Sequence, residues 1–225
     1  MSNQMMLFSE VPAAATGSVV TSRLVLYLDA ANTSSYPGSG TTWTDLSGSS
    51  NNGTLTSATY NTNGGGAIAT SGNSGSYVTI ASPNLAASNF TVMTGSRYSG
   101  ATRGRVVNAK NNNWLVGHWN SSVGNFYATG WVTSGTPTGG SDTNWRIYSA
   151  QGTIGGEFKL FINNAQTATS SAGGLAGPNG LSISKTLYPG EDSTSECAFI
   201  LAYNRVLTET EMTQNYNFFK TRLGL

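Results

Sequence analysis

The sequence predicts an all-β protein, a two-sheet antiparallel jelly-roll sandwich with one short helix near its C-terminal end. Three observations support this fold class. Nearly half of the 225 residues are Ser, Thr, Asn or Gly, which suit strands and turns better than helices. Short β-prone runs alternate with Gly- and Asn-rich turns along most of the chain. A clear helical pattern occurs only near the end, so strands must supply most of the core.

The first 22 residues show no strand alternation, and we predict an N-terminal arm at 1–22 ahead of a single domain at 23–225. An apolar cluster lies near the start of this arm: Met5, Met6, Leu7 and Phe8. Two interpretations stay open. The arm is a frayed terminus, or its apolar tip packs on a neighbouring subunit because such a cluster is costly to leave in water.

Strands are predicted from alternation and from turn residues. The first begins after Arg23, where Leu24, Leu26 and Leu28 fall on one side. Further strands in the first half are expected at 77–80, 90–97, 105–108 and 113–116. The clearest hairpin joins 144–150 to 157–162, and a strand at 165–169 follows. The stretch 196–203 is apolar on both sides, as expected for a central strand covered on both faces.

The C-terminal helix has the strongest local signal. Thr208 and Glu211 fit a capping box, in which each side chain bonds the backbone N–H of the other residue. An apolar stripe follows at spacings of four, three and four: Met212, Tyr216, Phe219 and Leu223. This stripe predicts that one face of the helix packs on a sheet. We expect the helix to end near Arg222, with Gly224 after it.

Composition excludes several classes of protein. Eleven Lys and Arg against ten Asp and Glu leave a formal net charge of +1, which is too little to attract nucleic acid or an anionic membrane at long range. No apolar run approaches the ~18 residues of a membrane-spanning helix. The single Cys197 cannot form an internal disulfide, and the N-terminus lacks a signal-peptide pattern. We therefore expect synthesis in a reducing cytoplasm, without nucleic-acid binding or membrane insertion.

Patterns for catalysis are weak. Glycoside hydrolysis needs two carboxyl groups across a sugar ring, and the only acids at i and i+2 are Glu209 and Glu211, which the helix cap explains. His118 is the only histidine and is expected at a strand end or in a loop. No G-x-S-x-G motif is present. Distant acids could still pair in the fold, but no spacing indicates it.

No cofactor is predicted. One His and one Cys exclude a closed zinc site on ligand number. Calcium needs only oxygen ligands, so two groups are candidates although neither has EF-hand spacing. These groups are Asp29 with Asn32, and Glu191 with Asp192 and Glu196.

Aromatic residues are the remaining candidates for a binding site, because sugars present flat C–H faces that stack on aromatic rings. Four of them lie near turns and are candidates for stacking against a glycan: Tyr36, Trp119, Trp131 and Tyr188. Packing in the core or within loops is the alternative for each. Trp114 and Trp145 fall on predicted strands, so we expect them in the core.

A run of four cations contains no acid: Arg97, Arg103, Arg105 and Lys110. A solvated loop and edge strand is one interpretation. Docking against the acidic surface of another subunit or a partner protein is the other.

Three parts of the chain carry a family pattern. The first comprises LVLYLDAAN at 24–32, SYPGSGTTWTDLSG at 35–48 and NNGTL at 51–55. The second is NWRIY at 144–148 with FKLFINN at 158–164, and the third is AYNRVLTETE at 202–211. Together they resemble concanavalin A-like lectin/glucanase domains of the laminin-G-like type, in the version found in bacteriophage and cyanophage structural proteins. The resemblance covers residues 23–225.

The resemblance implies a jelly-roll sandwich that binds glycans or proteins. Some lineages hydrolyse β-glucans with an E-x-D-x-x-E strand, which is absent here, so no enzymatic activity is expected. From the resemblance we predict a phage virion structural protein, a lectin-like capsid decoration or cement protein. It would be made in the host cytoplasm and sit on the virion surface as a homo-oligomer such as a trimer, against the major capsid protein or other virion proteins. The alternative is a carbohydrate-binding adsorption module of a tail or head fibre that recognises a host surface glycan. A glycan hydrolase is the least favoured hypothesis.

Overall fold

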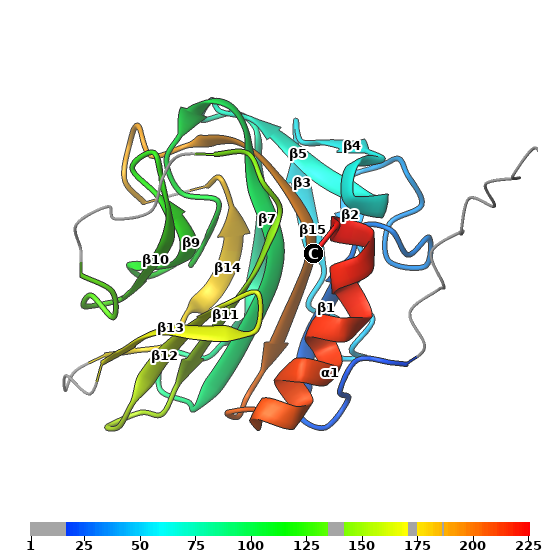
Figure 1. Cartoon of the computed structure of the whole chain (residues 1–225). Coiled ribbons are helices and arrows are strands. Elements are labelled where there is room, and N and C mark those ends of the chain that lie inside the picture. The colour runs from blue at the N-terminus through cyan, green and yellow to red at the C-terminus, as the bar shows by residue number, and fades with distance from the viewer. Residues whose placement is uncertain (1–16, 135–141, 171–174, 186) are drawn as a thin grey trace, which may run out of the picture.

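The chain folds as two antiparallel β-sheets packed face to face, with one α-helix on the outside of one sheet (Figure 1). The computed structural model describes residues 17–134, 142–170, 175–185 and 187–225. This architecture confirms the predicted all-β jelly-roll sandwich with one short C-terminal helix. We call the sheet that carries the helix the helix-side sheet, and the other the open sheet.

The helix-side sheet contains β1 (Leu24–Asp29), β4 (Thr59–Asn61), β5 (Ala67–Ser71), β7 (Phe90–Arg103), β11 (Arg146–Gly152), β12 (Phe158–Ile162), β13 (Ala165–Ser170) and β15 (Ser193–Tyr203). The open sheet contains β2 (Thr42–Trp43), β3 (Gly53–Thr56), β6 (Tyr77–Asn84), β8 (Val107–Asn108), β9 (Trp114–Trp119), β10 (Ser122–Ala128) and β14 (Asn179–Ile183). Helix α1 (Glu209–Lys220) continues into the 3-10 turn η2 (Thr221–Leu223), and another such turn, η1 (Asn63–Gly65), precedes β5.

The strand order of the helix-side sheet is β13-β12-β11-β7-β15-β5-β4, and β1 pairs with β15 beside this path. The open sheet runs β10-β9-β8-β14-β6-β3-β2. Neighbouring strands in both sheets pair antiparallel, as in the register of β15 against β7 and of β9 against β10. The predicted hairpin is present as β11 and β12, and β13 follows it.

Apolar side chains from alternate positions of both sheets fill the space between them. Phe90, Trp114, Phe126 and Phe158 lie in this core, with neighbouring ring centroids 5.7 to 6.4 Å apart. The predicted core position of Trp114 is therefore confirmed. Trp145 is half-buried and packs against a second apolar cluster under the helix.

That second cluster forms because β15 is buried on both faces, as its sequence predicts. Phe199, Leu201 and Tyr203 project from its outer face and are covered by α1. The rings of Phe199 and Phe219 stack with centroids 3.6 Å apart and planes inclined by 9°. The predicted helical stripe supplies the cover, and Figure 1 shows α1 lying along this side of the sandwich.

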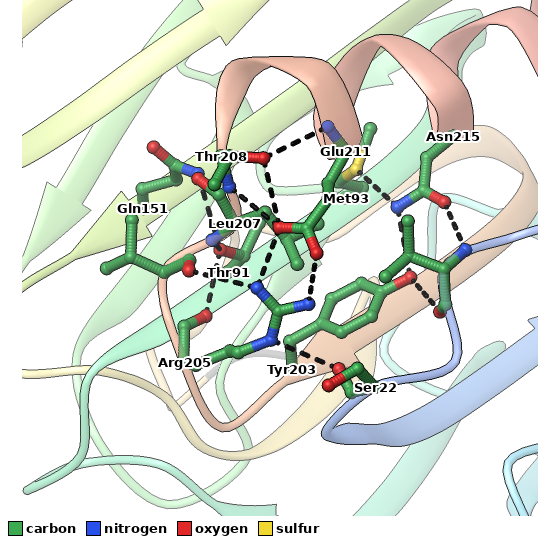
Figure 2. Close-up of polar contacts among 12 residues, drawn as sticks. Ser22, Thr91, Met93, Gln151, Tyr203, Arg205, Leu207, Thr208, Glu211 and Asn215 are labelled. Carbon is green, nitrogen blue, oxygen red and sulfur yellow. Dashed lines mark hydrogen bonds and ion pairs between the residues drawn. The ribbon is translucent and has the colours of Figure 1, made fainter.

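The capping box is present at the start of α1 (Figure 2). Thr208 Oγ1 accepts from the Glu211 N–H at 3.3 Å, and Glu211 Oε2 accepts from the Thr208 N–H at 2.9 Å. Arg205 donates to both carboxylate oxygens of Glu211 at 2.7 Å, and this pairing lowers the pKa of Glu211 to about 2. Gly224, with φ of 72°, follows η2, so the helical segment ends where predicted.

Asn215 joins the helix to the N-terminal residues. It is fully buried, accepts from the Val20 N–H at 2.8 Å and donates to the Tyr203 hydroxyl oxygen at 3.0 Å (Figure 2). The Tyr203 hydroxyl in turn donates to the Val20 carbonyl at 2.8 Å. Val19 and Val20 are buried against the helix, so packing of the domain begins before Arg23. Met5, Met6, Leu7 and Phe8 lie outside the described residues.

The predicted alternation of the first strand is wrong. The register of β1 against β15 shifts between Leu24 and Leu26, which places Leu24 with Tyr27 beneath the helix while Leu26 and Leu28 lie in the central core. A bulge inserts one residue and so reverses the alternation at that point. His118 is the next-to-last residue of β9, so it lies at a strand end as predicted, and it is fully buried.

His118 lies between two tyrosine rings of the opposite sheet. Its ring centroid is 4.6 Å from that of Tyr98 and 5.0 Å from that of Tyr148. Neither ring nitrogen has a hydrogen-bond partner among the described residues. Burial, with a smaller contribution from Arg146, lowers the pKa of His118 to about 3.

This burial predicts a pH dependence of stability. The unfolded histidine binds a proton below about pH 6.5 whereas the folded one stays neutral, so the free energy of unfolding should fall by up to about 1.4 kcal/mol per pH unit between pH 6.5 and 5. Carboxylates titrate mainly below this window. Urea unfolding at pH 5.0, 6.0 and 7.5 should show the slope in the natural chain and a much smaller slope in His118→Leu. Equal slopes in the two proteins would contradict the assignment.

Asn215 provides a second test. Asn215→Ala should lower the free energy of unfolding by about 2 kcal/mol, because it leaves the buried Val20 N–H without its acceptor. Asn217 lies on the exposed side of the same helix. Asn217→Ala is the matched control and should be neutral or slightly stabilising, since Ala is the better helix former. Thermal or urea unfolding of both variants checks the difference.

Candidate functional site

Three aromatic side chains form a contiguous group on the outer face of the open sheet. The ring centroids of Trp119 and Trp131 are 4.9 Å apart, and those of Trp131 and Tyr127 are 5.0 Å apart. All three residues are half-buried, so part of each remains accessible. We call Trp119, Trp131 and Tyr127 the aromatic row. In Figure 1, β9 and β10 lie at the left of the sandwich, away from α1.

Strand alternation places two members of the row. Trp114, Val116 and His118 of β9 point into the core, so Trp119 points outward. In β10, Phe126 points inward and Tyr127 therefore points outward.

Backbone turns bring the two strands together and place Trp131, the third member of the row. Asn120 and Ser121 have φ of 47° and 61°, which suits a two-residue hairpin between β9 and β10. After β10 the chain reverses at Thr129 (φ 62°), and Trp131 then forms an isolated antiparallel bridge with Tyr127. This bridge sets Trp131 beside Tyr127.

An ion pair holds Trp119 in place. Its indole Nε1 donates to Glu191 Oε1 at 3.1 Å, while Glu191 Oε2 accepts from Arg105 Nε. Arg105 Nη1 also donates to Asn113 Oδ1 at 2.7 Å, and its guanidinium lies 4.6 Å from the centre of the Tyr188 ring. We call the contacts of Glu191 with Arg105 and Trp119 the Glu191 clamp. The clamp joins the loop that precedes β15 to the tip of the β9–β10 hairpin.

A shallow pocket of about 380 Å³ lies next to the clamp. Trp119 and Glu191 form part of its wall, and Arg103, Asn120 and Ser121 contribute polar groups. The pocket therefore shares Trp119 with the aromatic row.

The structure brings together three of the four predicted stacking residues. Trp119 and Trp131 touch, and Tyr188, 39% exposed, lies against Arg105 of the clamp. Tyr36 is the exception: its predicted stacking role is wrong because the fold buries the side chain. It is only 4% exposed, its ring packs 5.7 Å from that of Tyr60, and its hydroxyl donates to the Gly40 carbonyl at 2.8 Å.

Sequence reasoning missed Tyr127 and the role of Glu191. A signal for Tyr127 exists, because adjacent Phe126 and Tyr127 on one strand must face opposite sides. The sequence indicates Glu191 as a calcium candidate and gives no signal for its pairing with an arginine. Its actual partner, Arg105, is 86 residues away in the sequence, so only the fold shows their contact.

The four predicted docking cations do not form one unpaired patch. Arg105 is paired with Glu191, and Arg97 pairs with Glu196 at 2.7 Å while lying over the Trp145 ring. Arg103 donates to the Gly100 carbonyl at 2.8 Å and lines the pocket. Lys110 lies on a separate loop, where its backbone N–H donates to the Gly180 carbonyl. Glu191 and Glu196 thus neutralise two of the four positive charges that docking against an acidic surface would use.

The candidate calcium ligands are also engaged elsewhere. Asp29 pairs with Arg222 at 2.7 Å and accepts from the Ala31 N–H, and Asn32 accepts from the Ser34 N–H. Glu191 and Glu196 bind different arginines. No group of three or more His, Cys, Asp and Glu side chains suited to a metal occurs within the part of the chain that the structure describes.

Carboxyl groups with clear pKa shifts are shifted downward. Two hydrogen bonds from Arg146 lower the pKa of Asp142 to about 2, and Arg205 does the same to Glu211. A general acid in glycoside hydrolysis needs a raised pKa. Neither residue is suited to that role.

No protein-family model and no curated protein sequence matches this chain. Solved structures do match its fold. The binding domain of Paraclostridial Mosquitocidal Protein 1 aligns with a TM-score of 0.65 and 15% identity over 87% of this chain and 52% of its own. Trypanosoma rangeli sialidase in complex with 2,3-difluorosialic acid aligns with a TM-score of 0.64 and 15% identity over 94% of this chain and 35% of its own.

A third structure is domain 4 of AbnA, a GH43 extracellular arabinanase from Geobacillus stearothermophilus, in complex with arabinotriose. It aligns with a TM-score of 0.62 and 14% identity over 85% of this chain and 97% of that domain. The chain thus spans about half of the mosquitocidal protein's chain and about a third of the sialidase. At these identities the likeness establishes the β-sandwich fold. Among the described residues, no helix has the length and apolar character to cross a membrane.

The Glu191 clamp predicts an unequal effect of two glutamate substitutions. Glu191→Ala leaves Arg105, only 6% exposed, without its carboxylate and should lower the free energy of unfolding by about 2 kcal/mol. Glu157→Ala is the control because its pair with Lys159 is on the surface, and it should change stability by less than about 0.5 kcal/mol. Urea unfolding measures both. Similar stabilities for the two variants would show that the clamp contributes little.

Proposed function

We propose that this chain is a non-catalytic carbohydrate-binding module in which the aromatic row holds a glycan. The observation that carries this proposal is the contact of three half-exposed aromatic rings on the outer face of the open sheet. The one α-helix among the described residues covers the other sheet, so this face is not used for helix packing. Sugar C–H faces stack on such rings, and fixed rings lose little conformational entropy on binding.

The neighbouring pocket supplies the polar half of such a site. Asn120, Ser121 and Glu191 line it, and groups of these types can hydrogen-bond sugar hydroxyls. Glycan sites generally combine an apolar surface with a few placed polar groups. Two structural neighbours support the proposal, one being a binding domain and the other domain 4 of an arabinanase in complex with arabinotriose.

The absence of catalysis is part of the proposal. Several described carboxylates are paired with arginines: Asp29, Asp142, Glu191, Glu196 and Glu211. For Asp142 and Glu211 this pairing lowers the pKa, and an ionised carboxylate cannot donate a proton to a leaving group. Binding without turnover is the expected behaviour.

The phage resemblance adds a finer proposal, that the module is a lectin-like decoration or cement protein on a virion. Many copies on a symmetric shell would combine weak glycan contacts by avidity. Two of the four candidate docking cations, Arg97 and Arg105, are paired with carboxylates. The virion placement is therefore supported mainly by the resemblance. The decisive observation would be the position of the chain in an image of the intact particle.

The test of glycan binding uses the full chain on a glycan microarray, followed by titration calorimetry with the best ligand. Trp119→Ala and Trp131→Ala should each weaken binding by about tenfold or more, since loss of one stacking ring costs about 1.5 kcal/mol. Tyr216→Ala, which removes an aromatic ring from α1 away from the row, is the control and should leave affinity unchanged. Circular dichroism confirms that each variant is folded. Binding that survives both tryptophan substitutions would contradict this site, and failure to bind any glycan would contradict the function.

A further inference from the structure

The geometry of the aromatic row constrains the form of its ligand. Two links of about 5 Å join the three rings, so the row extends over at most about 10 Å between its outer centroids. One ring-to-ring link is about as long as one sugar unit in a linear glycan. The row is therefore about as long as a segment of three consecutive sugars.

The three rings do not share a plane. Trp119 and Trp131 are inclined by 57°, and Trp131 and Tyr127 by 81°. A flat crystalline polysaccharide presents the faces of successive sugars in one plane, so it could lie flat on only one of these rings. A single chain that rotates from one sugar to the next can present a face to each ring in turn.

The rings are also prevented from becoming coplanar. The Glu191 clamp fixes the indole of Trp119, and the backbone bridge to Tyr127 fixes the position of Trp131. Tyr127 belongs to a strand that is paired along its length with β9. With their backbones held in this way, neighbouring rings only about 5 Å apart cannot lie side by side in one plane without overlap of their edges. Flattening the row would require the rings to move apart, so the inclined arrangement is the one presented to a ligand.

We infer that the ligand is a single soluble glycan chain that twists along its length and is held over about three consecutive sugars, with Tyr127 contacting one end of that segment. This inference rests on the proposed function. The pocket beside Trp119 gives the other end of the segment a polar environment. The flat surface of a crystalline polysaccharide is excluded as the main target by the ring inclinations.

The experiment compares ligand length and physical form with the full chain. Soluble arabinan, xylan, β-glucan, α-glucan and chitin oligosaccharides of one to six units are titrated by calorimetry, and microcrystalline cellulose and chitin powders are used in pull-downs. In the series that binds, affinity should rise from one to three units and then level off, with little retention on either powder. Tyr127→Ala should remove about a tenfold gain that comes with the third unit. Tyr127→Phe, which keeps the ring, should retain the gain.

Three results would overturn the inference while leaving the proposed function intact. They are affinity that does not depend on length, an unchanged length dependence in Tyr127→Ala, and stronger retention on a powder than on its soluble oligosaccharide. Absence of binding to every glycan in both forms would instead overturn the proposed function, and the inference with it. Unfolding curves of the Tyr127 variants separate a binding defect from a folding defect.

Discussion

The burial of β15 on both faces is the constraint on which the rest of the structure depends. A strand with apolar residues on both sides needs two covering layers, since either face left in water would cost the free energy that burial provides. The open sheet covers the inner face and α1 covers the outer face. Because the helix is committed to the helix-side sheet, the outer face of the open sheet is left to loops and to the aromatic row. The location of the candidate site thus follows from how the core is closed.

Polar groups within these layers determine how the elements fit together. Asn215 and Tyr203 bind the backbone of Val20 under the helix, so the chain before β1, the helix and β15 are fixed relative to one another. His118 is different, because it is buried between tyrosine rings without a partner among the described residues. An unpartnered buried imidazole costs the hydrogen bonds it made to water, and in acid it opposes folding further because the folded side chain stays neutral. The contacts of Asn215 and Tyr203 with Val20 specify the fold, whereas the burial of His118 limits the pH range in which the fold is stable.

Sequence patterns predicted those parts that depend on neighbouring residues. The capping box at Thr208 and Glu211 is complete within four residues, and the apolar stripe that begins at Met212 is set by one helix. Contacts between distant segments were not predictable. The bulge at Leu24 depends on the register with β15, and the burial of Tyr36 depends on Tyr60. Turn residues near Trp119 and Trp131 indicated partial exposure, but their mutual contact requires the chain reversal after β10.

The Glu191 clamp links the stability of the domain to the geometry of the site. Its carboxylate neutralises a buried arginine and at the same time orients the indole that shapes one end of the row. A substitution at Glu191 would therefore alter folding and ring position together, and its effect on binding could not be assigned to either alone. Neither Trp131 nor Tyr127 neutralises a buried charge. Substitutions of these two residues therefore measure the contribution of stacking to binding more directly. A site built in this way gains preorganisation by sharing its supports with the fold. For the same reason its ring geometry should be retained in the absence of ligand.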